Sequence, residues 1–259
     1  MIREDLGPRF VASVVAFCNA CAAPSVRGRL GGETGPPMRL ILLGPPGCGK
    51  GTQAQLLCAR NGLEHIGTGD ILRQAIQQQT PAGVRAHPFV EKGLLVPDSL
   101  VNDVIAERFN LGDPPERFVM DGYPRTLAQA AAFDQVLRQN FLDLTAVILL
   151  HVSDEEIIAR VSERWSCPKP GCKATYHTTS KPTKATGICD SCGTRLIQRE
   201  DDRPETVRAR LVVYHGNTEA LVGHYRAQKL LHEVAGQGPI EEVYASVMKI
   251  LNGQAGRKC

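Results

Sequence analysis

The chain has 259 residues, of which 42% are hydrophobic and 22% are charged, and its formal net charge is +3 at pH 7. This composition is typical of a globular protein that buries a sizeable core in one or two domains. Charge alone does not indicate a nucleic-acid or membrane partner, and no apolar run reaches the roughly 18 residues of a membrane helix.

The nine cysteines bear on the compartment and on metal binding. Their number is odd, and most of them cluster locally, which is not the pattern of a secreted disulfide framework. We therefore expect a reducing cytoplasm and a metal site. Cys18 and Cys21 form a lone CxxC motif with no second pair nearby, so no metal is assigned to them.

The first 37 residues differ from the rest of the chain. They hold an apolar stretch at 10–23 and a Gly/Pro-rich segment that ends immediately before Met38. Arg3 and Arg9 ahead of an apolar stretch are compatible with an export signal, but acidic residues dilute the basic flank. We favour the alternative, an unstructured extension upstream of a folded domain that spans 38–259.

From Met38 onward, short apolar runs alternate with longer amphipathic segments. The short runs have the length and residue types of buried strands. Strands are predicted at 38–44, 118–120, 146–152 and 230–234. Because helices separate these strands, the pattern indicates the α/β class, with a parallel β-sheet covered by helices on both faces.

The amphipathic segments predict helices, and two of them carry start signals. Ser153, with Glu156 three residues later, forms a capping box. Asp202 and Pro204 open a long helix. The predicted helices cover 49–60, 153–164, 204–227 and 240–251.

The segment GPPGCGKGT, residues 44–52, follows the first predicted strand and enters the first predicted helix. Its glycines let successive backbone N–H groups curl around a phosphate, the helix N-terminus adds positive potential, and Lys50 adds a full charge. This is the context of a phosphate-binding P-loop. In the strict GxxxxGK[ST] pattern a hydroxyl follows the lysine, whereas here Gly51 precedes Thr52, which indicates a subclass.

Four further motifs accompany the P-loop. They are GTGDILR at 67–73, DGYPRT at 121–126 with Gln129 behind it, ARVSER at 159–164 and QREDDRPETVRARL at 198–211. Together the five motifs make the chain similar, from Met38 to about Leu251, to the adenylate kinases, in their bacterial form with a long, zinc-binding lid. The resemblance implies a P-loop NTPase fold with an inserted lid at 163–202 and a helical NMP-binding subdomain at 67–96.

The resemblance also implies an enzyme that converts ATP and AMP into two ADP, reversibly and with Mg2+. Phosphoryl transfer passes through a loose, charge-rich transition state, so the site must position and neutralise two anions more than it needs a base. The residues expected to do so are Lys50, Asp121, Arg125, Arg164, Arg199 and Arg210. Asp121 is expected to order the water around Mg2+, with a helix N-cap as its alternative role.

Further residues are expected, by the same resemblance, to bind the two nucleotides. Those for ATP are Gly47, Cys48, Gly49, Lys50, Gly51, Thr52, Arg160, Arg164, Thr175, Tyr176 and Gly238. Those for AMP are Thr68, Arg73, Leu94, Leu95, Val96, Gly122, Tyr123, Pro124, Arg125, Gln129, Arg199 and Arg210. Thr68 and Gln129 would recognise adenine; their alternative roles are a turn hydroxyl and an exposed amide. Independently of the resemblance, Arg160 and Arg164 are four residues apart on a predicted helix and would share a face.

Two cysteine pairs, in CPKPGC and CDSC, lie between Arg164 and Arg199. Four thiolates suit tetrahedral zinc, although the first pair has four intervening residues where two are usual. The predicted ligands are Cys167, Cys172, Cys189 and Cys192. Asp190 is a fallback ligand, and metal-free thiols or a disulfide are the alternatives. Such zinc would be structural, because a lid this small cannot bury much apolar surface.

Two rival functions fit parts of the sequence. One is a kinase that prefers another monophosphate or GTP, and the other is a zinc-ribbon protein that binds nucleic acid. The lid region has only Trp165 and Tyr176 as aromatic residues, which does not favour the ribbon. We expect ATP, AMP and ADP as ligands, neither nucleic acid nor a membrane as partner, and a monomer.

Overall fold

The computed structural model describes residues 37–110, 114–172, 174–218 and 220–255. The predicted N-terminal extension and its Cys18–Cys21 motif therefore fall outside the described residues, apart from position 37. Within the described ranges, no helix has both the length and the apolar character that crossing a membrane requires.

Five parallel strands form the central sheet, in the order β2-β3-β1-β4-β7. The strands are β1 (Arg39–Leu43), β2 (Glu64–Gly67), β3 (Phe118–Asp121), β4 (Ala146–His151) and β7 (Leu231–Ala235). The prediction of a parallel sheet is confirmed. Strand β2 was not predicted, because its four residues include the polar Glu64 and His65 and show no apolar run.

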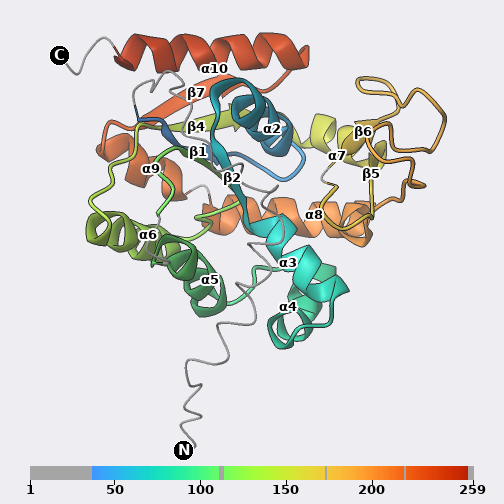
Figure 1. The fold of residues 1–259 in the computed structure, drawn as a ribbon, viewed down its shortest axis with the longest axis horizontal. Coiled ribbons are helices and arrows are strands. Elements are labelled where there is room, and N and C mark those ends of the chain that lie inside the picture. Colours follow the sequence, from blue (N-terminus) through green and yellow to red (C-terminus); the bar gives the residue numbers. More distant parts are fainter. Residues whose placement is uncertain (1–36, 111–113, 173, 219, 256–259) are drawn as a thin grey trace, which may run out of the picture.

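Helices cover both faces of this sheet (Figure 1). On one face lie α2 (Lys50–Asn61) and α10 (Ile240–Ala255), and on the other α5 (Asp98–Asn110), α6 (Leu127–Gln139) and α9 (Ala220–Ala227). Alternate residues of β1 point to the two layers: Leu40 and Leu42 pack with α2 and α10, while Ile41 and Leu43 join the other cluster. The sheet is therefore buried on both sides, which explains its continuous apolar strands.

Two small subdomains are inserted at the carboxyl end of the sheet. The first holds α3 (Thr68–Gln77) and α4 (Pro81–Glu91). The second, the lid, holds the antiparallel strands β5 (Arg164–Ser166) and β6 (Thr175–His177) and lies between α7 (Asp154–Ser162) and α8 (Pro204–Val213). The two subdomains touch, since Gln77 Nε2 donates a hydrogen bond to Pro168 O at 3.4 Å.

The prediction that Arg160 and Arg164 share a helical face is wrong. Helix α7 ends at Ser162, and Arg164 pairs with His177 in the β5–β6 ladder instead. At the helix start, Ser153 Oγ does accept from Glu156 N at 3.4 Å. The reciprocal half of the capping box is absent, because the Glu156 carboxylate pairs with Arg160.

The long helix predicted over 204–227 is divided into three parts. Helix α8 is followed by a π-helical segment at Tyr214–Thr218 and then by α9. The sequence there is YHGNT, in which Gly216 and Asn217 are weak helix formers. Asn217 Nδ2 donates to Val213 O at 3.3 Å and Thr218 Oγ1 donates to Arg125 O at 3.0 Å, so side-chain contacts accompany the irregular backbone.

Gly83 allows α3 and α4 to pack closely. A Cβ atom at this position would lie 2.1 Å from Ala75 O. We expect Gly83→Ala to lower the free energy of unfolding by about 1–3 kcal/mol, the usual cost of overpacking, in urea titrations. Gly253→Ala, at an exposed position of α10 where an added Cβ would meet no atom within 4 Å, is the control and should be neutral or stabilise by up to about 1 kcal/mol. Equal effects of the two substitutions would contradict this packing.

Candidate active site

The P-loop lies between β1 and α2. Gly44, Gly47 and Gly49 have φ angles of +139°, +85° and +100°, in the region that favours glycine. At Gly44 an added Cβ would also lie 2.7 Å from Leu150 O, so the turn against β4 requires glycine. No side chain caps α2. Its first backbone N–H groups can therefore serve an anion.

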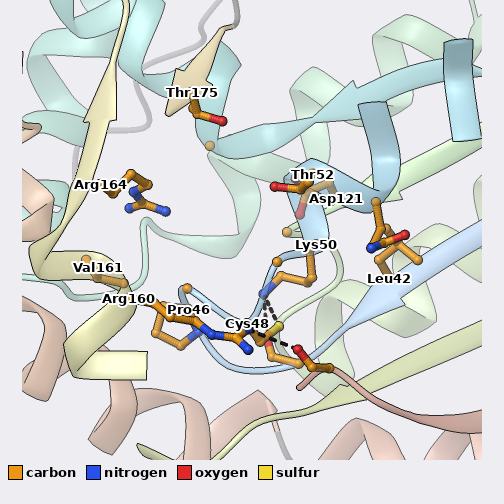
Figure 2. A pocket seen from close by; sticks show the side chains of 18 of the residues that line it. Leu42, Pro46, Cys48, Lys50, Thr52, Asp121, Arg160, Val161, Arg164 and Thr175 are labelled. Atoms are coloured by element: carbon orange, nitrogen blue, oxygen red, sulfur yellow. Dashed lines mark hydrogen bonds between the residues drawn. The ribbon is translucent and has the colours of Figure 1, made fainter. Parts of the chain in front are cut away.

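Lys50 is the first residue of α2. Its Nζ donates to Gly44 O at 2.7 Å and to Pro45 O at 2.8 Å, and lies 3.6 Å from Cys48 Sγ (Figure 2). The ammonium group is thus held at the loop by backbone carbonyls. It can exchange these contacts for phosphate oxygens without changing its own charge.

The P-loop forms the floor of a cleft of about 1070 Å³. All the predicted ATP-binding and catalytic residues line this cleft. In Figure 2, Arg164 lies on the lid side and faces Lys50, Thr52 and Asp121 across it. A smaller cavity of about 60 Å³ adjoins the cleft, shares Arg73, Arg125 and Arg210 with it, and is also lined by Thr68, Leu94, Leu95, Val96, Gly122 and Gln129.

Tyr123 is the one predicted AMP-binding residue that lines neither cavity. Its side chain is buried, and its hydroxyl contacts Asn102 Oδ1 at 2.8 Å and Gln129 O at 3.1 Å. Its ring packs edge-on against Phe133, with centroids 5.6 Å apart. Tyr123 is therefore a core residue that supports the site from beneath. The aromatic residue in DGYPRT resembles a ligand contact in sequence, but the fold turns it inward.

Four of the six predicted arginines form ion pairs at the cleft. Arg160 pairs with Glu156, and the other three pair with aspartates. Arg164 forms a bidentate pair with Asp202, in which Nε donates to Oδ2 at 2.8 Å. Asp201 lies between the other two, with its Oδ2 at 3.0 Å from Arg210 Nη1 and 3.4 Å from Arg73 Nη1. Asp202, predicted to open a helix, instead lies in a short 3-10 turn at Glu200–Asp202.

The other two arginines have no carboxylate partner among the described residues. Arg125 donates from Nε to Gly122 O at 2.7 Å, while Arg199 makes no hydrogen bond or ion pair within the described ranges. Burial, together with the nearby Arg73 and Arg164, lowers the pKa of Arg199 to about 10. Burial likewise lowers the pKa of Arg210 to about 10, although Asp201 opposes this. Arg125, Arg199 and Arg210 all remain charged at pH 7, so the cleft holds cations that an anion would stabilise.

Asp121 ends β3 beside the P-loop. An added Cβ on Gly51 would lie 3.3 Å from Asp121 Oδ2, and His65 Nε2 lies 3.6 Å from the same oxygen. Burial raises the pKa of Asp121, but His65 and Lys50 outweigh it and hold that pKa below its usual value. The alternative role of Asp121 as an N-cap is wrong, because Thr126 caps the following helix α6.

The predicted adenine-recognition pair is buried. Thr68 is 4% exposed and Gln129 is 2% exposed, so Gln129 is not the exposed amide of its alternative role. Thr68 Oγ1 donates to Gly122 O at 2.9 Å. Gln129 Oε1 accepts from Arg125 N at 2.7 Å, and its Nε2 donates to Asp98 Oδ1 at 2.7 Å.

Sequence analysis missed His65 and Asp98. His65 lies on a strand too short to be predicted, and Asp98 stands 31 positions before Gln129, its partner in the fold. Asp201 and Asp202 stand in the motif QREDDRPETVRARL, from which only a helix start at Asp202 was predicted. Only their position opposite the arginines shows what they do.

The four lid cysteines converge. Their Sγ atoms all lie within 4.8 Å of one another, with 3.4 Å between Cys167 and Cys192 and 3.7 Å between Cys172 and Cys189. Four sulfurs around tetrahedral zinc, at bonds of about 2.3 Å, are separated by about 3.8 Å. The donor set therefore fits zinc. These distances are too long for the disulfide alternative, and the four residues are free thiols.

The wider CPKPGC turn closes without displacing its cysteines. Gly171 adopts a φ of +79°, and Cys172 N donates to Lys169 O at 3.0 Å, so the turn accommodates the additional residues. Asp190 is not a ligand in this arrangement, because its Oδ1 accepts from Lys184 N at 3.0 Å. Local geometry is therefore compatible with a site formed by the four sulfurs alone.

Tyr176 supports one of these thiols. Its hydroxyl accepts from Asp190 N at 2.8 Å and lies 3.5 Å from Cys189 Sγ. This contact, with backbone hydrogen bonds from Ser191 and Cys192, lowers the pKa of the Cys189 thiol to about 6, which favours the thiolate that a metal binds. In contrast, burial raises the pKa of Cys167 to about 12, so at pH 7 this thiol would release its proton to solvent only when a metal binds the sulfur.

Comparison with known proteins tests the resemblance. A family profile described as adenylate kinase matches residues 42–230. The chain belongs to the adenylate kinase family. It is 47% identical over 214 residues to an adenylate kinase of Lachnospira eligens, which covers 83% of this chain and 100% of the relative. It is 45% identical over 216 residues to an adenylate kinase of Geotalea daltonii, an alignment that covers 83% of this chain and 100% of the relative. It is 44% identical over 214 residues to an adenylate kinase of Archaeoglobus fulgidus, an alignment that covers 83% of this chain and 98% of the relative.

Membership of this family confirms the predicted fold class and reaction. Adenylate kinases transfer a phosphoryl group between ATP and AMP to give two ADP, and the chain is a phosphotransferase of this kind. Family members bind these nucleotides and use Mg2+ with ATP. The parallel sheet, the P-loop at its carboxyl edge and the arginine-lined cleft are the parts that this reaction requires.

Proposed function

We propose that phosphoryl transfer takes place where the large cleft meets the smaller cavity. The observation that carries this assignment is the pair Arg125 and Arg199, half-buried cations without a carboxylate partner among the described residues. A buried cation is stabilised by an opposite charge, and a planar guanidinium grips two phosphate oxygens at once. The α-phosphate of AMP and the γ-phosphate of ATP would supply those charges.

On the donor side, ATP would place its phosphates in the P-loop. The N-terminal amides of α2 and Lys50 would hold the β- and γ-phosphates, with Lys50 leaving the carbonyls of Gly44 and Pro45. The adenine would lie near Arg160 and Gly238, which both line the cleft. Arg160 Nη1 already donates to Gly236 O at 3.0 Å, so its guanidinium is fixed beside that loop.

On the acceptor side, AMP would occupy the smaller cavity, within the proposed AMP-binding region 67–96. Thr68 and Gln129 would contact its adenine, and Arg73 and Arg125 its phosphate. Leu94, Leu95 and Val96 supply an apolar wall. The acceptor phosphate would then face the P-loop across Arg125, which lines both cavities. Such alignment is the main contribution that a protein makes to phosphoryl transfer.

The residues around Asp121 fit Mg2+. This hard cation prefers carboxylate, hydroxyl and phosphate oxygens. The Asp121 carboxylate and the Thr52 hydroxyl both line the cleft beside the P-loop. Mg2+ bound with ATP would neutralise phosphate charge, and Asp121, by ordering the water around the ion, and Thr52 would hold it beside the P-loop.

The lid at 163–202 would exclude water from the transferring group and carry structural zinc. Thr175 and Tyr176 line the cleft, and Arg164 and Arg199 stand at the two ends of the lid. Closing such a segment removes water that competes as phosphoryl acceptor. Because free thiols are needed to bind the metal, we place the enzyme in the reducing cytoplasm, and we expect a monomer, which size-exclusion chromatography with light scattering would test.

A panel of acceptor nucleotides tests the proposed base recognition. We expect kcat/KM to be highest for AMP with ATP as donor, and lower by about 100-fold or more for UMP and CMP, since buried amide and hydroxyl groups would lose their partners. The measurement is product formation followed by chromatography. Faster turnover of UMP or CMP than of AMP would contradict the assignment of Thr68 and Gln129.

A further inference from the structure

The side-chain amide of Gln129 is held at both ends. Its Nε2 lies 2.7 Å from Asp98 Oδ1, and its Oε1 lies 2.7 Å from the backbone N of Arg125. A carboxylate can only accept hydrogen bonds, and a backbone N–H can only donate. The two partners therefore determine which end of the amide is nitrogen and which is oxygen.

Asp98 is itself fixed to the helix that carries Gln129. It is the first residue of α5, and its Oδ2 accepts from Thr126 Oγ1 at 2.8 Å. The same Thr126 oxygen accepts from Gln129 N at 3.1 Å and caps α6. Both carboxylate oxygens are thus engaged, one on the cap of the helix and one on the amide.

The amide keeps one unused position on each atom. Nε2 has a second hydrogen and Oε1 has a second lone pair, and Gln129 lines the small acceptor cavity. Adenine offers an exocyclic N–H donor next to a ring-nitrogen acceptor, which an amide can satisfy with both atoms at once. The 6-oxopurine hypoxanthine, in IMP, has the reverse order on its N1–C6 edge, with an oxygen acceptor next to an N–H donor.

We propose that Asp98 is a positioning residue that selects adenine over hypoxanthine by fixing the orientation of the Gln129 amide. The inference rests on the proposed function of Gln129 in binding the base of AMP. To bind hypoxanthine the amide would have to flip. A flipped amide would place Oε1, an acceptor, against the Asp98 carboxylate and Nε2, a donor, against the Arg125 backbone N–H. Both contacts would then be repulsive, so Asp98 and Arg125 disfavour the flipped orientation.

Asp98→Asn tests this with little change of shape. An asparagine amide can donate as well as accept, so it tolerates either orientation of Gln129 and leaves only the Arg125 N–H to oppose a flip. We expect the ratio of kcat/KM for AMP to kcat/KM for IMP to fall by about tenfold or more, the effect of losing one charge-assisted hydrogen bond. The KM for ATP should not change.

The ratio is measured on a single protein preparation, so any loss of folded enzyme affects both substrates equally and cancels. Asp103→Asn is the matched control, since it removes the same charge from an exposed position on the same helix α5. The AMP-to-IMP ratio of kcat/KM for Asp103→Asn should equal that of the wild type. An equal fall in both variants would overturn the proposal, because net charge would then account for the effect.

Gln129→Ala, measured in parallel, distinguishes the base-binding role of Gln129 from the positioning role of Asp98. If the wild type does not prefer AMP to IMP, or if Gln129→Ala keeps the preference, the proposed function of Gln129 is wrong and the role of Asp98 falls with it. If Gln129→Ala loses the preference while Asp98→Asn keeps the wild-type ratio, the role of Asp98 alone is overturned. Loss of the preference in both variants supports both assignments.

Discussion

Replacement of Arg125 by alanine is expected to lower kcat/KM for AMP by about 1000-fold, the upper range for removing one preorganised donor to developing charge. Arg125 lines both cavities, and its Nε is fixed to Gly122 O, which directs the guanidinium without neutralising it. Burial lowers its pKa and Asp121 partly restores it, so the cation is available to a phosphate.

Arg125→Lys should recover only a small part of this activity. Lysine keeps the charge, but it cannot hold Gly122 O and grip two phosphate oxygens with one planar group. Steady-state kinetics with ATP and AMP would measure both variants, and thermal unfolding would check their folding. Arg138→Ala, which removes an exposed arginine from α6, is the control and should match the wild type. An Arg125→Ala protein within about tenfold of wild-type kcat/KM would contradict the placement of the transferring phosphates.

Replacement of Cys167 and Cys189 by serine is expected to abolish zinc binding and unfold the lid. Elemental analysis should find about one zinc per wild-type chain, bound by the four lid sulfurs, and almost none in the double variant. The lid's own core is small, with Tyr176, Cys189 and Leu196 as its buried residues. Metal binding would therefore supply much of the free energy that folds it.

Loss of the metal should appear as rapid proteolysis between residues 163 and 202 and as a lower Tm. A chain of this size loses roughly 2–4 °C for each kcal/mol of destabilisation, so a fall of about 5 °C or more is expected. Cys58→Ser on α2 removes a thiol outside the lid and should leave zinc content and proteolysis unchanged. Wild-type protein without zinc, or a double variant with an intact lid, would contradict the structural role of the metal.

Features that depend on neighbouring residues could be predicted from the sequence. Gly44, Gly47 and Gly49 of GPPGCGKGT have the positive φ angles that the loop requires. Apolar runs gave the positions of four of the five parallel strands. These properties are local, because backbone conformation and burial pattern follow from residue types a few positions apart.

Other features depend on contacts between distant segments, and only the tertiary structure decided them. Arg164 lies in a strand and not in the predicted helix, because it pairs with β6. The ring of Tyr123 points into the core and packs against Phe133. Asp98 meets Gln129 only because α5 packs against α6. The motifs by themselves determined the family and its phosphate chemistry. Which charges are paired, and how the amide of Gln129 is oriented, follows from long-range packing that no local pattern encodes.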